Sequence, residues 1–111
     1  MKNSLKITSI GLGLLFAGTV CVAAPAAENW ENNCTKCHGA DGKGDTKIGK
    51  KLKLKDYSDA AVQAKFSDEE LVKAINEGVS ENGKEKMKAF KDVLAPDEIK
   101  DLVGYIRKLK S

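Results

Sequence analysis

The sequence has few of the residues from which metal and catalytic sites are usually built. Its 111 residues include one histidine, three cysteines, two methionines and two prolines. Cys21 and the initiator methionine both lie within the first 26 residues, so the remainder keeps two cysteines, one histidine and one methionine. Structural zinc takes four protein ligands, usually Cys and His, and only three are present there. A site with two imidazole ligands within one chain is excluded as well.

Net charge and aromatic residues are also sparse. Aromatic residues make up 5% of the chain, and the formal net charge is +3, or +1 without Lys2 and Lys6. A protein that binds nucleic acid shows a strongly basic face, so no nucleic-acid partner is expected. The length suits one domain, but the apolar residues make a thin core. Domains of this size generally need a cross-link or a bound group that stabilises the fold in addition to the core.

The N-terminal segment has the pattern of a secretory leader. A positive start is followed by an apolar stretch at 7–22, and the small residues at 24–26 form an A-x-A-type cleavage site. We therefore predict a signal peptide at 1–26 that is cleaved, leaving a domain at 27–111 in the periplasm with no membrane span. Cleavage after Ala23 is a close competitor, and an uncleaved leader would act as a membrane anchor.

The strongest motif is Cys34-Thr35-Lys36-Cys37-His38. Two thiols three positions apart, followed at once by an imidazole, is the spacing of c-type haem attachment. Each cysteine adds across one porphyrin vinyl group, and positions i and i+3 share one face of a helix. We therefore predict one covalently bound haem c, attached through Cys34 and Cys37, with His38 as the proximal iron ligand.

Other chemistries also use a Cys-x-x-Cys pair. Zinc lacks a fourth ligand here, as stated above. A thioredoxin-like redox site needs a βαβ setting, and no strand–helix–strand pattern surrounds Cys34 and Cys37. A structural disulfide stays open from the motif alone, and the absence of colour in the purified protein would favour it.

Helical patterns dominate the rest of the chain, and no strand pattern is visible. Ser67 and Glu70 form a capping box, and Gly78 stands where a helix-ending glycine is expected. In the last helix Gly104 is expected to allow close approach of the first helix. The predicted helices are 28–37 with Trp30 facing inward, 59–65 capped by Ser58, 67–77, and a final helix from Pro96 with the apolar stripe Ile99, Leu102, Val103, Ile106 and Leu109.

Residues 39–57 show neither the helical nor the strand spacing of apolar residues. They are predicted to form an irregular loop along one side of the haem. Ligating histidines usually donate their second ring nitrogen to an acceptor. We expect a backbone carbonyl within 48–51 to accept from Nδ1 of His38. The same loop holds five lysines and no acid between 47 and 55, a basic segment that is either simply solvated or used in docking.

Met87 is the candidate for the second iron ligand. It is the only methionine after the initiator, and it lies in a polar stretch at 79–90 between Lys86 and Lys88. A lone methionine usually fills space in a core. A thioether in such polar surroundings makes sense if it reaches into an apolar cleft and binds iron as the distal ligand.

Together these features resemble a small bacterial class I cytochrome c. The resemblance covers nearly the whole mature chain and includes the haem motif, the Ser67-Asp68-Glu69-Glu70-Leu71 helix start, Lys86-Met87-Lys88 and Leu102-Val103-Gly104-Tyr105-Ile106. It implies an all-α cytochrome c fold of three to five short helices around one haem, with crossing N- and C-terminal helices. It also implies His38/Met87 ligation and Trp30 packed against Leu102 and Tyr105.

Closed His/Met ligation leaves no open iron position, so the expected function is one-electron transfer rather than catalysis. Residues 84–91 carry a net charge of +3 and 67–81 a net charge of −4. Such a dipole favours partners with acidic docking surfaces. Candidate partners are a quinol–cytochrome c oxidoreductase, a terminal oxidase or a periplasmic dehydrogenase, and the chain itself is expected to be a monomer.

Two other functions stay open at this point. The chain is alternatively a haem c subunit of a larger oxidoreductase complex, which co-purification would reveal. A haem-based ligand sensor, or a peroxidase-like enzyme with a labile distal Met87, is the less favoured of the two. Carbon monoxide binding to the reduced protein would identify that case.

Overall fold

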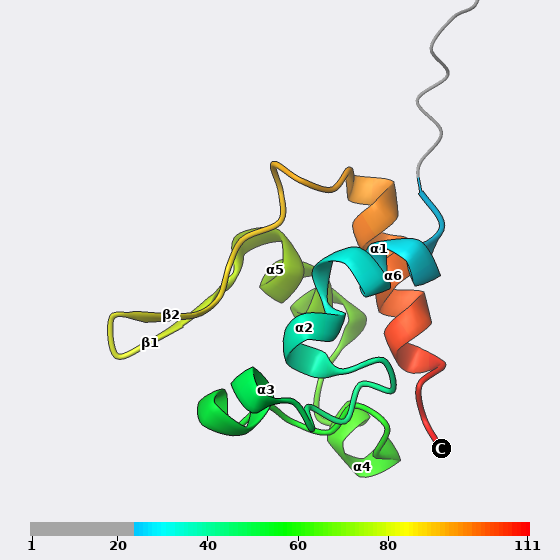
Figure 1. Cartoon of the computed structure of the whole chain (residues 1–111). Helices are drawn as coiled ribbons and strands as arrows, with labels where there is room; N and C mark the ends of the chain where they lie inside the picture. The colour runs from blue at the N-terminus through cyan, green and yellow to red at the C-terminus, as the bar shows by residue number, and fades with distance from the viewer. Residues whose placement is uncertain (1–23) are drawn as a thin grey trace, which may run out of the picture.

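The computed structural model describes residues 24–111, so the predicted leader up to residue 23 lies outside the described part. The described residues form short helices and one hairpin (Figure 1). No helix within 24–111 is long and apolar enough to cross a membrane. The elements are α1 (Ala26–Asn33), α2 (Thr35–His38), α3 (Lys47–Leu52), α4 (Ala60–Gln63), α5 (Asp68–Glu77), β1 (Val79–Glu81), β2 (Lys84–Met87) and α6 (Pro96–Arg107).

The core forms where α1 and α5 pack against α6, as the predicted crossing of the terminal helices requires. Trp30 of α1 is 3% exposed, and its ring centre lies 5.6 Å from that of Tyr105. Leu102 is the most deeply buried residue of the same cluster. Burial of one such large apolar side chain stabilises the fold by about 1.5–3 kcal/mol. The predicted packing of Trp30 against Tyr105 is therefore confirmed, and Leu102 lies in the same buried cluster.

The apolar stripe of α6 is buried as predicted, but Gly104 is not part of the helix interface. The four stripe residues within α6 are buried and Leu109 is partly buried. Gly104 is exposed, and a Cβ built on it would meet nothing within 4 Å. The expected close approach at Gly104 is wrong, because this residue lies outside the buried stripe.

Glu98 closes the start of α6 and joins it to α1. Ala95 stands at the N-cap without a side-chain acceptor, and Glu98 Oε1 accepts from the Ala95 backbone N–H at 3.0 Å. Its Oε2 accepts from the buried Asn29 amide at 2.8 Å. These hydrogen bonds, that of Ala95 first, hold the pKa of Glu98 below its usual value.

Arg107 ties the other end of α6 to the chain between α4 and α5. Its guanidinium donates to the carbonyls of Phe66 at 2.6 Å and Gln63 at 2.8 Å, and to Asp68 at 2.9 Å. The buried Gln63 amide in turn donates to the Ile106 carbonyl at 2.8 Å. Both ends of α6 are thus fixed by polar contacts as well as by the core.

The local structure differs from the sequence-based expectation at several helix boundaries. The single helix expected at 28–37 is broken at Cys34, whose φ of −119° interrupts the turn between α1 and α2. The expected irregular loop contains α3, which is capped by Thr46. Asp59 rather than Ser58 caps α4, because its carboxylate accepts from the Ala61 N–H at 2.8 Å.

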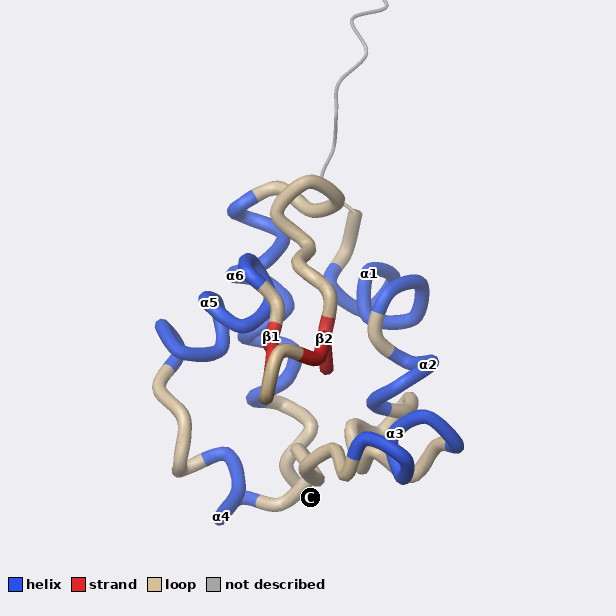
Figure 2. The backbone as a smooth tube through the Cα atoms, turned by 90° about the vertical axis from the view of Figure 1, so that its left-hand side faces the viewer, coloured by secondary structure: helices blue, strands red, loops and turns tan. Residues whose placement is uncertain are grey.

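A two-stranded antiparallel hairpin follows α5, where the sequence showed only a polar loop (Figure 2). Its register pairs Val79 with Met87 and Glu81 with Lys84. Asn82 and Gly83 form the tip, with φ values of 53° and 75°. Asn-Gly with positive φ at both positions is the preferred two-residue hairpin turn. No strand pattern was visible in the sequence, and this Asn-Gly dipeptide was the overlooked signal for the hairpin.

Candidate functional site

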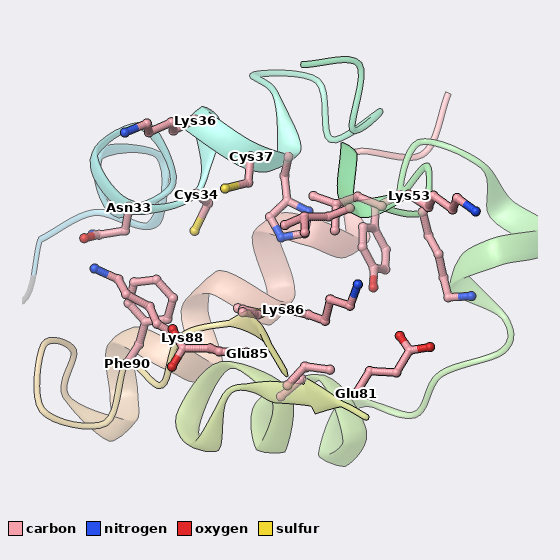
Figure 3. Close-up of a pocket in the computed structure, with 18 of the residues that line it drawn as sticks. Asn33, Cys34, Lys36, Cys37, Lys53, Glu81, Glu85, Lys86, Lys88 and Phe90 are labelled. Atoms are coloured by element: carbon pink, nitrogen blue, oxygen red, sulfur yellow. The ribbon is translucent and has the colours of Figure 1, made fainter. Parts of the chain in front are cut away.

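A cavity of about 540 Å³ lies between α2, the chain after α3 and the hairpin (Figure 3). This volume falls in the range of about 300–1,000 Å³ that is typical of cofactor pockets. The four predicted site residues, Cys34, Cys37, His38 and Met87, all line it. Its apolar walls are formed by Leu52, Leu54, Tyr57, Ala74, Val79 and Phe90.

Cys34 and Cys37 present their sulfur atoms to this cavity (Figure 3). Both are free and partly buried in the structure. Burial, with a smaller contribution from the neighbouring Cys37, raises the pKa of Cys34 to about 11. Cys34 therefore rests as a thiol, and both sulfur atoms lie at the cavity, as the predicted attachment of two vinyl groups requires.

The backbone of the Cys37–His38 turn is held by the loop that follows it. The Thr46 hydroxyl donates to the Cys37 carbonyl at 2.7 Å, and the Gly44 N–H donates to the His38 carbonyl at 2.8 Å. Gly49 fits against the same turn, since an added Cβ would meet the Cys37 carbonyl oxygen at 2.7 Å. The glycine-rich loop thus holds the two cysteines and the histidine in place.

Trp30 adds a contact from α1 to the end of the motif. Its indole N–H donates to the Gly39 carbonyl at 3.1 Å. Its ring centre lies 5.7 Å from that of His38, and Tyr57 approaches His38 from another side at 5.9 Å. Two aromatic rings therefore flank the imidazole, and the sequence predicted neither of these two contacts with His38.

His38 is suited to bind a metal as the neutral imidazole. Burial lowers its pKa, and a metal ligand uses the lone pair of the neutral ring. Its Nδ1 is buried and has no hydrogen-bond partner among the described residues. No carbonyl within 48–51 accepts from Nδ1 in this structure, and those of Gly49 and Lys50 instead accept from the backbone at the end of α3.

Met87 reaches the site from the last position of β2. It lines the main cavity and also a small apolar cavity of about 50 Å³ that it shares with His38. Three residues further on, the N–H of Phe90 donates to the Ile75 carbonyl of α5 at 2.9 Å. The hairpin and this anchor together place the thioether against the same cavity as the imidazole.

The residues present fit a covalently held haem c. Two thiols, one imidazole with an orphaned buried nitrogen, and one thioether meet at a single cavity. The apolar walls match a flat macrocycle, and the thiols have the neighbouring placement that two thioether bonds need. His38 and Met87 are the residues that could bind iron.

Lysines from three elements surround the mouth of the cavity (Figure 3). Lys86 and Lys88, the predicted docking lysines on either side of Met87, line the cavity. Lys53 and Lys55, whose role was open from the sequence, also line it, as does Lys36, which had no predicted role. Only proximity in the fold could show that the two basic segments meet at one opening.

Comparison with known proteins agrees with this site. Residues 22–106 match the family described as Cytochrome C oxidase, cbb3-type, subunit III. The chain is 29% identical over 114 residues to cytochrome c6 of Nostoc sp. (strain PCC 7120 / SAG 25.82 / UTEX 2576), covering 96% of this chain and 92% of that protein.

Solved structures give the same result. The KustC0563 c-type cytochrome superposes with a TM-score of 0.71 at 38% identity, covering 79% of this chain and 100% of that one. A tyrosine-to-phenylalanine mutant of that cytochrome gives 0.69 at 38% identity, with coverage of 78% and 100%. Helix arrangement, site residues and relatives agree. The chain therefore belongs to the family described as Cytochrome C oxidase, cbb3-type, subunit III, and is a small monohaem class I cytochrome c, an electron carrier with covalently bound haem c.

Proposed function

We propose that this protein is a periplasmic one-electron carrier whose haem iron is bound by His38 and Met87. The main support for this proposal is that Met87 lines the same cavity as Cys34, Cys37 and His38, although it comes from a different part of the chain. An N-terminal leader, removed on export, brings the chain to the periplasm, where the two thioether bonds are formed.

Each of these residues has a distinct role in the carrier. When bound, haem c supplies a ferric–ferrous couple that accepts and releases one electron. Cys34 and Cys37 fix the position of the group, and His38 offers a neutral nitrogen. Met87 offers a thioether, which raises the potential relative to an imidazole. Because His38 and Met87 would both bind the iron, the chain would leave it no position open to a substrate, and we propose no catalytic residue.

The apolar walls act in the same direction as Met87. Leu52, Leu54 and Phe90 line the cavity and limit the access of water. An apolar shell disfavours the more highly charged oxidation state and so raises the potential. His38 and Met87 would hold the iron in both oxidation states, so little rearrangement of the chain would accompany each electron.

The basic mouth of the cavity provides a docking surface. Lys36, Lys53, Lys55, Lys86 and Lys88 lie around it together with two acids, Glu81 and Glu85. Partners with acidic surfaces would be attracted and oriented there, with an association rate that falls as salt is added. We propose a monomer that exchanges electrons with a quinol–cytochrome c oxidoreductase, a terminal oxidase or a periplasmic dehydrogenase.

Replacement of Met87 by alanine tests the ligand assignment. The Met87→Ala holoprotein should have a markedly lower potential and should bind carbon monoxide when reduced, unlike the wild type. Val79→Ala is the matched control, because Val79 pairs with Met87 across the hairpin and lines the same cavity. An unchanged potential without carbon monoxide binding in Met87→Ala would show that Met87 is not a ligand.

A permanent subunit of a larger oxidoreductase complex is the second candidate. The family description names an oxidase subunit, whereas the structural neighbour is covered over its full length by this chain. We favour the free carrier because residues of this chain match a solved small c-type cytochrome over that protein's full length. Gel filtration of the native periplasmic fraction decides, since a subunit would elute with its complex. Carbon monoxide binding by the reduced wild type would instead favour a sensor or peroxidase-like function.

A further inference from the structure

The backbone at Ala24 and Pro25 is bound to the folded domain. The N–H of Ala24 donates to Glu98 Oε2 at 3.3 Å, and its carbonyl accepts from the Asn29 side-chain amide at 3.3 Å. The Pro25 carbonyl accepts from the Asn29 N–H at 3.0 Å, which is the first backbone hydrogen bond of α1. These two residues are therefore an integral part of the α1–α6 junction.

The Glu98 carboxylate at this junction has no cationic partner within residues 24–111. The salt bridges of the described part are Lys50–Asp45 and Arg107–Asp68. All the groups that Glu98 contacts there are neutral N–H donors. An acid that holds its pKa below the usual value through neutral donors would gain from a positive charge at the position of the Ala24 nitrogen.

We infer that the leader is cleaved between Ala23 and Ala24, and that the α-ammonium group of Ala24 then pairs with Glu98. This inference rests on the proposed export of the chain. A signal peptidase would hydrolyse the amide bond between Ala23 and Ala24. Addition of water across this bond gives Ala23 a carboxylate and Ala24 an ammonium group. The amide offers one donor and the ammonium three. Ala23 and Cys21 supply the small residues that the cleavage site requires.

Cleavage after Ala26, which the sequence pattern favours, would remove groups that the fold uses. The Pro25 carbonyl would be lost as an acceptor for the Asn29 N–H, together with both contacts of Ala24 and the first residue of α1. Asn29 directly precedes Trp30, which is hydrogen-bonded to Gly39 behind the haem motif. The mature N-terminus thus supports the helix that carries this contact.

N-terminal sequencing and the intact mass of the exported holoprotein give the first test. A chain that starts Ala24-Pro25 is the expected result. A start at Ala27 overturns the inference and leaves the proposed carrier untouched. A retained Met1 overturns it as well and also contradicts the proposed removal of the leader, so the two failures are distinguishable.

The pKa of the α-amino group gives the second test, measured by pH-dependent labelling of the mature N-terminus and mass spectrometry. In the wild type it should lie above its ordinary range of about 7.7–8.0. Glu98→Gln keeps an acceptor oxygen, now in a side-chain amide, and removes the negative charge. This variant should return the pKa of the α-amino group to that range. Asp97→Asn removes a charge from an exposed position in the same turn and should preserve the raised value. Equal values in all three proteins would overturn the pairing.

Discussion

Replacement of Gly78 by alanine should displace Met87 without a change in any proposed ligand. Gly78 ends α5 with φ 78° and ψ 179°, a backbone region that is essentially restricted to glycine. A Cβ at this position would lie 2.6 Å from the Met87 carbonyl oxygen and 2.8 Å from the Ala89 nitrogen. These are backbone atoms, so the chain on both sides of the Met87 side chain has to move.

The size of the effect follows from two costs at Gly78. A non-glycine residue in this backbone region costs about 1–3 kcal/mol. Forcing extra volume into a packed site costs about 1–3 kcal/mol more. We therefore expect Gly78→Ala to lose about 2–6 kcal/mol of unfolding free energy. The weak ferric absorption band of methionine–iron ligation should fade, because the thioether no longer reaches its position.

Substitutions at two other glycines distinguish the backbone cost from the cost of added volume. Gly83 at the hairpin tip also has positive φ, 75°, but an added Cβ would meet nothing within 4 Å. Gly83→Ala should therefore lose only the backbone term, about 1–2 kcal/mol. Gly104 is helical and equally open, so Gly104→Ala should gain up to about 1 kcal/mol from helix propensity. Both variants should keep the full methionine band.

Urea unfolding of the ferric holoproteins and their absorption spectra provide the measurement. The expected order of stability is Gly104→Ala, wild type, Gly83→Ala and Gly78→Ala. A Gly78→Ala protein that is as stable as Gly83→Ala and retains the full methionine band would refute this prediction. That result would mean that the close approach of Gly78 to β2 does not set the position of Met87.

Three further perturbations address other parts of the molecule. Trp30→Phe removes the indole donor and should cost about 1 kcal/mol in urea unfolding, with the iron ligation unchanged. Because hydrogen bonds, that of Ala95 first, lower the pKa of Glu98, its stabilisation is present above pH 4.5 and is lost as pH falls further. Glu98→Gln should therefore flatten the acid limb of a stability–pH profile, and an unchanged limb would contradict this. Lys88→Glu at the cavity mouth should slow association with an acidic redox partner at low salt, whereas Lys100→Glu on α6 should have little effect.

Much of the site was predictable because covalent chemistry needs fixed residues at fixed spacing. Cys34, Cys37 and His38 follow from the attachment motif alone, and Met87 followed because only one methionine remained after the leader. The structure brings these residues to one cavity. The stripe of α6 and the capping box at Ser67 were also predictable, since both depend on contacts within one or two helical turns.

The tertiary structure decided the features that depend on partners distant in the sequence. The hairpin turn at Asn82 and Gly83 is a local signal, but the position of Met87 at the cavity also depends on the anchoring of Phe90 to Ile75 of α5. The break at Cys34 and the bond between Asn29 and Glu98 exist because α1 must meet α6 and the haem motif together. The prediction for Gly104 was wrong for the same reason, since sequence alone could not show whether a glycine faces a neighbouring helix or open space. Local periodicity and ligand chemistry are encoded in neighbouring residues, whereas register, junctions and the shape of the cavity emerge only when the segments pack.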